Sequence, residues 1–191
     1  MFKKALLVLT GCLSCLSSFA APVQWAGNGH WYEYIDTNLT WDDAFAAANA
    51  STFMGMSGYL ATVTSEAENT FVSISVANGS LAWLGGSDAG AAVNEWTWRN
   101  GPEAGQAFTY ANWLAGEPNN CCGGEDYVHT NFISLAGWND HGGPGNAGQA
   151  NGYLVEYSAP VPEPLSVLLT VSGLAVVGVS TRRRRGRVGA P

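Results

Sequence analysis

The sequence predicts an α+β domain in the middle of the chain. Two segments with helical signals come first, between residues 41 and 76, and short apolar segments of strand length make up most of the rest. Among these strand segments lies the glycine-rich stretch 99–126, which shows no hydrophobic periodicity. Helices segregated from short strands are typical of the α+β class. A long irregular loop inside a compact domain is usually functional, so residues 99–126 are the first candidate location for a site.

Both predicted helices have explicit start signals. Thr40 is a favourable N-cap for a helix over residues 41–50, whose alanines suit packing on a sheet. Ser65 and Glu68 form a capping box, which predicts a second helix reaching to about Val76. The remaining segments are too short for helices. We expect strands near residues 29–34, 81–85, 95–98 and 153–157, and a core built from Trp31, Trp41, Trp83, Trp98, Trp113 and Trp138.

Basic and acidic residues are separated along the chain. Arg99 is the only lysine or arginine between residues 21 and 160, whereas that stretch holds every acidic residue except Glu163. A body this acidic repels a phosphate backbone, which argues against nucleic acid as a partner. The acidic body is far better suited to binding cations. An acidic surface can also serve solubility alone.

The two ends predict export and sorting rather than fold. Residues 1–20 have the pattern of a secretory signal peptide, with Lys3 and Lys4 before an apolar run and small residues up to Ala20. A competing interpretation is lipidation at Cys12, but this would leave an apolar core of only about six residues, shorter than the usual ~7–15. We therefore expect cleavage after Ala20, which removes the two N-terminal cysteines.

Residues 159–191 have three parts. A Val161–Pro164 breaker precedes an uncharged apolar run at 165–181, and a basic tail begins at Arg182. The run is at the short limit for a transmembrane helix, and the basic tail would stay cytoplasmic. This order resembles the PEP-CTERM sorting signal of exopolysaccharide-producing bacteria. The resemblance implies an exosortase as processing partner and a protein released or attached outside the cell. A plain membrane anchor is the alternative.

Oxygen-bearing side chains gather in and after the irregular loop. Calcium takes six to eight oxygen ligands from carboxylates, amides and carbonyls, and a cis bond before Pro118 would turn its two neighbours toward one point. Sulfur and histidine are absent from the set, so zinc and copper fit less well. The candidate metal ligands are Glu117, Asn119, Glu125, Asn139 and Asp140.

Cys121 and Cys122 lie side by side in this loop. Three interpretations remain open: a disulfide between the two, bridges to another chain, or free thiols. Passage through the periplasm favours oxidation.

The body, residues 21–158, resembles a C-type lectin-like domain. The matching motifs are Gly58–Val63 with Ser65, Trp83-Leu84-Gly85-Gly86, Tyr110–Trp113, Glu117-Pro118-Asn119 and Trp138-Asn139-Asp140. The resemblance implies two helices, two small antiparallel sheets and a long irregular calcium loop.

The resemblance also implies a function. The five candidate ligands would hold one calcium, and a sugar would bind through Glu117, Asn119, Glu125 and Asn139. In this family Glu-Pro-Asn accompanies mannose-type sugars, and Gln-Pro-Asp accompanies galactose. The expected partners are glycans or exopolysaccharide. A second, weak calcium site would use Asp88, Asn120 and Asp126 together with Glu125.

The sequence departs from the family pattern at its cysteines. The family cysteine of the last strand is replaced near Val155, and the one in the calcium loop is replaced by Tyr127. Each lost bridge could forgo roughly 2–5 kcal/mol.

Two other functions compete with sugar binding. Glu117 and Glu125, flanked by His129 and His141, could be the paired carboxylates of a glycosidase, but nothing in the sequence orients a nucleophile. We therefore expect no enzyme. The stronger alternative is a calcium-independent protein-binding or structural matrix module of the same fold.

Overall fold

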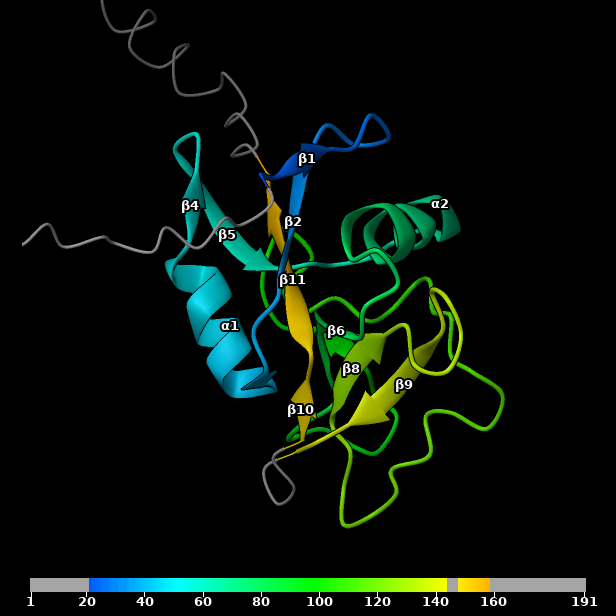
Figure 1. Ribbon diagram of the computed structural model, residues 1–191. Helices are drawn as coiled ribbons and strands as arrows, with labels where there is room; N and C mark the ends of the chain where they lie inside the picture. Colours follow the sequence, from blue (N-terminus) through cyan, green and yellow to red (C-terminus); the bar gives the residue numbers. More distant parts are fainter. Residues whose placement is uncertain (1–20, 144–147, 159–191) are drawn as a thin grey trace, which may run out of the picture. The chain divides into compact units, whose positions relative to one another are not determined.

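The computed structural model describes residues 21–143 and 148–158 (Figure 1). These belong to a compact unit that ends at Ser158. The predicted signal peptide, the sorting signal and the apolar run at 165–181 lie outside the described residues. Within the described part, no helix is long and apolar enough to cross a membrane.

The described residues form an α+β fold, as the sequence predicts, but with a different division of the sheets. One mixed sheet of nine strands has the order β1-β2-β11-β6-β8-β9, with β5 on β11, β4 on β5 and β7 on β6, while β3 and β10 form a separate pair. Two small antiparallel sheets were expected. They are merged because the last strand, β11, lies between β2 and β6 and pairs with β6 in parallel. The strands are β1 (Val23–Gln24), β2 (Trp31–Ile35), β3 (Leu39–Thr40), β4 (Thr52–Phe53), β5 (Met56–Leu60), β6 (Ala82–Ser87), β7 (Thr97–Trp98), β8 (Tyr127–Thr130), β9 (Trp138–His141), β10 (Gln149–Ala150) and β11 (Gly152–Tyr157).

Both helices begin at their predicted caps. Helix α1 spans Trp41–Ala50, and the Thr40 side chain accepts a hydrogen bond from the amide of Asp43. Helix α2 spans Glu66–Thr70 behind the Ser65 cap and continues as the π-helical turn η1, Phe71–Val76. The predicted extent is therefore correct. The type differs in the second half, where the Ala77 amide bonds to the Val72 carbonyl five residues earlier.

Strand β11 separates two hydrophobic clusters, because successive side chains of a strand point to opposite faces. Leu154 packs with Val72 of η1 and with Trp138. Its neighbour Val155 packs with Trp41 of α1. The two helices accordingly lie on opposite sides of β11 in Figure 1. Of the six tryptophans predicted to build the core, Trp41, Trp83, Trp98 and Trp138 are buried, and Trp31 and Trp113 are partly buried against it.

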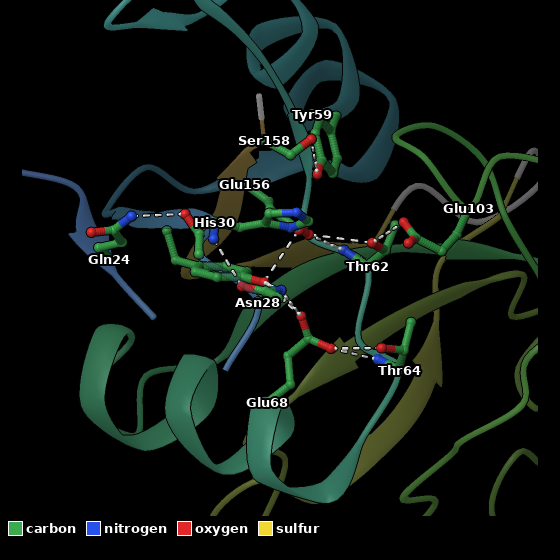
Figure 2. Close-up of polar contacts among 12 residues, drawn as sticks. Gln24, Asn28, His30, Tyr59, Thr62, Thr64, Glu68, Glu103, Glu156 and Ser158 are labelled. Atoms are coloured by element: carbon green, nitrogen blue, oxygen red, sulfur yellow. Dashed lines mark hydrogen bonds and ion pairs between the residues drawn. The ribbon is translucent and has the colours of Figure 1, made fainter. Parts of the chain in front are cut away.

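A buried polar cluster ties α2 to the centre of the sheet. Glu156 lies on the same face of β11 as Leu154 and is only 1% exposed. Glu68 of α2 is 2% exposed. The Tyr32 hydroxyl donates to both carboxylates, at 2.5 Å to Glu68 and 3.2 Å to Glu156. Glu68 also accepts from the amide and hydroxyl of Thr64, as Figure 2 shows.

The Glu156 carboxylate is satisfied from two further directions. Its Oε2 accepts from the Thr62 amide at 3.0 Å, and its Oε1 lies 2.5 Å from His30 Nδ1 (Figure 2). Burial raises the pKa of Glu156, and Glu156 in turn raises the pKa of His30 through their hydrogen bond. No local signal in the sequence marks this cluster.

The irregular loop is fixed to the sheet by aromatic packing. Trp98 stacks on Phe108 with ring centroids 4.2 Å apart, and Trp113 meets Trp138 edge to face at 5.8 Å. The backbone of Trp138 bonds to Asn112 and to Leu114. The loop segment that follows Trp113 is therefore held beside β9, the strand that begins at Trp138.

Candidate functional site

Four of the five predicted ligands line one pocket of about 240 Å³. Glu117, Asn119 and Glu125 come from the irregular loop, and Asn139 comes from β9. The irregular loop reaches the pocket because its Trp113 packs on Trp138, and Trp138 directly precedes Asn139 in the chain. The other lining residues are Leu81, Cys121, His129, Phe132 and His141.

The fifth predicted ligand, Asp140, lies behind the pocket rather than in its lining. Its side chain is fully buried. One carboxylate oxygen accepts from the Asn119 amide at 3.1 Å, and the other accepts from the Asn120 amide at 2.7 Å. Asp140 thus holds the loop in place behind Asn119.

Glu117 has a buried carboxylate oxygen that would suit a cation. Its Oε2 atom is buried without a hydrogen-bond partner. Its pKa is raised by burial and by the negative charges of Asp140 and Glu125. The peptide bond between Glu117 and Pro118 is cis. A cation at this place would pair the orphaned oxygen and offset the repulsion between the carboxylates.

The donor set fits calcium by its chemistry. Carboxylates from Glu117 and Glu125 and amides from Asn119 and Asn139 offer hard oxygen ligands, which calcium prefers. Among residues 21–143 and 148–158, no three His, Cys, Asp or Glu side chains form a group that could hold a metal ion. A calcium here would take the two asparagines together with the two glutamates as ligands.

His129 orients Asn139, a role that no sequence motif indicates. His129 is 2% exposed, and burial lowers its pKa to about 3, so the ring is neutral. Its Nε2 therefore accepts from Asn139 Nδ2 at 3.1 Å, which leaves the amide oxygen of Asn139 for a ligand. Only the β8–β9 register, with His129 opposite Asn139, brings the two residues together.

His141 and Cys121 both contact Glu125. The Nδ1 atom of His141 lies 3.3 Å from Glu125 Oε1, and the Cys121 amide donates to Glu125 Oε2 at 3.1 Å. Cys121 and Cys122 form a disulfide within the loop. Of the three interpretations left open by the sequence, the structure has the bond between the two neighbours.

Two residues of the predicted second calcium site, Asn120 and Asp88, accept hydrogen bonds from backbone amides. Asn120 Oδ1 accepts from the Glu125 amide at 2.8 Å, and Asp88 Oδ2 accepts from the Asn94 amide at 2.8 Å. Asp88 Oδ1 is buried without a partner, and burial together with the charges of Asp126 and Asp140 raises the pKa of Asp88.

Comparisons with known proteins identify the family. The chain is 38% identical over 141 residues to Halomucin of Haloquadratum walsbyi, a match that covers 69% of this chain but spans 1% of that protein. It is 30% identical over 118 residues to a snaclec salmorin polypeptide of Gloydius brevicauda, with 56% of this chain and 70% of that protein covered. The fold matches that of the C-type lectin CEL-I from Cucumaria echinata with a TM-score of 0.57 and 23% identity over 76% of this chain and 98% of that one.

The chain belongs to the C-type lectin-like family. No family model matches the sequence. As a C-type lectin-like protein it has a carbohydrate-recognition fold and is not an enzyme, which confirms the prediction against a glycosidase. Glu117 and Glu125 are accounted for as pocket residues of this fold.

Proposed function

We propose that the protein is an exported, calcium-dependent lectin for mannose-type glycans of an exopolysaccharide matrix or of cell surfaces. The observation that carries the proposal is the convergence of Glu117, Asn119, Glu125 and Asn139 on one pocket in which a Glu117 oxygen lacks a partner. The predicted signal peptide and sorting signal support export, with release or attachment outside the cell after exosortase processing.

Glu117, Asn119, Glu125 and Asn139 would hold the ion, with Asp140 fixing the loop behind them or joining the ligands. Calcium, when bound, supplies a dipositive centre that takes two neighbouring sugar hydroxyls as ligands. The side chains then do the rest of the recognition. Carboxylates of Glu117 and Glu125 would accept hydrogen bonds from the hydroxyls, and the amide of Asn119 would donate to them. Asn139 would contribute its amide oxygen, because its NH2 group is engaged by His129 and by the Asp140 carbonyl.

A pocket of this size can contact only a few sugar hydroxyls, so the affinity of each site for a glycan would be low. Useful affinity would then come from many copies of the protein or many sugar units on one polymer, since linked sites bind with a high effective concentration. A polysaccharide matrix offers such repetition.

Calorimetric titration of calcium into the purified protein tests the metal site. We expect micromolar to millimolar binding by the parent and its loss in Asn119→Ala. Gln106→Ala is the matched control, because it removes an exposed amide of the same loop outside the pocket. Equal binding by Asn119→Ala and the parent would place the ion elsewhere.

Retention on a mannose column tests the sugar step. We expect retention with calcium and release by a chelator. A folded protein that is retained equally with and without chelator would favour the alternative, a calcium-independent protein-binding or structural matrix module.

A further inference from the structure

We propose that the Cys121–Cys122 disulfide is a reversible thiol–disulfide exchange site, and that its reduction weakens calcium binding at the neighbouring pocket. The inference rests on the proposed function, since it assigns a control to that same site. It follows from where the disulfide lies, what its backbone holds, and how accessible it is.

The disulfide lies inside the ligand segment. Cys121 lines the pocket beside Glu117, Asn119 and Glu125. The two cysteines stand between two predicted ligands, two residues after Asn119 and three before Glu125. A change of conformation at this pair therefore acts on both ligands at once.

The Cys121 amide is a shared donor to these two ligands. It donates to Asn119 Oδ1 at 2.9 Å and to Glu125 Oε2 at 3.1 Å. A second contact closes the segment, because the Glu125 amide donates to Asn120 Oδ1 at 2.8 Å. The orientation of the Cys121 peptide thus decides where the oxygens of Asn119 and Glu125 point.

The bond lies in a stretch of backbone that ordinary residues avoid. Cys122 has φ of 60° and Asn120 has φ of 48°, both in the left-handed region. Residues other than glycine rarely adopt this region. Once the sulfurs are separated, Cys122 is free to return to the common right-handed or extended conformations, and the Cys121 peptide turns with it.

The disulfide can be reached, and breaking it has local effects. Cys122 is exposed and Cys121 is half-buried. The two residues are adjacent in the chain, so the bond closes no long loop and contributes little to global stability through chain entropy. Reduction is therefore expected to change the pocket while the fold persists.

The exchange needs a thiol reductant, either one dithiol or two monothiols. With a dithiol, a thiolate of the reductant attacks one cysteine sulfur, the sulfur–sulfur bond breaks, and a mixed disulfide forms. The second thiol of the reductant then displaces the cysteine, leaving two protein thiols and an oxidised reductant. Two electrons and two protons pass to the protein, and an oxidising disulfide of the same class reverses the step.

Calcium and the disulfide are then linked in both directions. If reduction weakens calcium binding about tenfold, saturating calcium must make the disulfide tenfold harder to reduce, because coupling between two sites is reciprocal. For a two-electron couple, tenfold corresponds to a shift of about 30 mV in the reduction potential.

The experiment measures both sides of this coupling in the purified protein. Calcium affinity is measured by calorimetry before and after treatment with dithiothreitol, and reduction of the peptide holding residues 121–122 is followed by mass spectrometry in glutathione buffers with and without calcium. The control is the C121S/C122S variant, in which dithiothreitol must leave calcium affinity unchanged. In metal-free protein, the side-chain amide NMR signals of Asn119 are expected to shift on reduction.

The outcomes separate the two proposals. A loss of about tenfold in calcium affinity on reduction, matched by calcium protection of the disulfide, supports the inference. Equal calcium affinity of the oxidised and reduced protein overturns the inference and leaves the lectin proposal standing. Absence of calcium binding in both redox states overturns both. Global unfolding on reduction, seen by circular dichroism, overturns the local mechanism.

Discussion

Replacing Glu156 by alanine tests whether the buried polar cluster stabilises the fold. The Glu156 carboxylate accepts from the Thr62 amide, and this donor is 2% exposed, so water cannot easily replace the acceptor. The other donors keep partners. In the variant, the Tyr32 hydroxyl still has Glu68 as acceptor, and the Thr62 hydroxyl still has Glu103. The His30 side chain is partly exposed, so it can bond to water.

The expected cost follows from these contacts. One orphaned buried amide costs about 1–3 kcal/mol, and the lost methylene adds about 0.8 kcal/mol. Removing a buried charge beside Glu68 offsets part of this, which leaves about 2–3 kcal/mol. For a domain of this length, each kcal/mol moves the melting temperature by roughly 3–4 °C. Glu156→Ala is therefore expected to lower Tm by about 6–12 °C.

Thermal unfolding followed by circular dichroism at pH 7 measures this shift. Glu156→Gln keeps an oxygen acceptor for the Thr62 amide and should lose less than about half as much. Glu33→Ala is the matched control, because Glu33 on β2 is half-buried and accepts one side-chain hydrogen bond, from the Tyr157 hydroxyl at 2.9 Å. Equal Tm values for Glu156→Ala and Glu33→Ala would refute the reasoning.

Three further predictions concern pH, calcium and sugar choice. The pKa values of Glu156 and His30 are raised above 4.5 and 6.5, so the folded state binds these protons more tightly and stability is lost as pH rises through the folded values. Urea unfolding should show the parent losing stability relative to Glu156→Gln as pH rises above the ordinary glutamate value of 4.5, and an opposite trend would contradict the assignment. Calcium at a hundredfold excess over Kd should add about 2.7 kcal/mol and raise Tm by roughly 8–11 °C, an effect that Asn119→Ala should abolish. The double change E117Q/N119D should move column retention from mannose to galactose, as the family motifs imply. An unchanged preference for mannose would show that these motifs do not determine sugar specificity in this protein.

Local signals predicted the parts of the fold that depend on neighbouring residues. Thr40 caps α1 because its hydroxyl needs only the amide of Asp43, three residues away. The π-helical end of α2 had no such signal. Ser73 within it bonds to Thr130 of β8, a partner 57 residues distant, and a contact of this kind cannot be read from a short window.

The same limit applies to the site. Glu117, Asn119 and Asn139 belong to short motifs, so their presence in one pocket could be predicted from the sequence. The roles of Asp140 and His129 could not. Asp140 is engaged by loop amides about 20 residues away, and His129 meets Asn139 through the register of β8 and β9. Glu156 was missed because only the alternation of β11 and the placement of α2 bury it.

The positions where the family pattern has cysteines show how this chain holds its fold together. Tyr127 stacks on Trp41 of α1 with ring centroids 4.4 Å apart and an angle of 3° between the planes. Val155 packs in the same cluster against the same helix. Truncating a buried aromatic side chain costs about 3–5 kcal/mol, which is comparable to the roughly 2–5 kcal/mol of a native disulfide. Apolar packing on α1 therefore replaces the missing disulfides, and the single disulfide of the described residues lies beside the pocket, next to the predicted ligands.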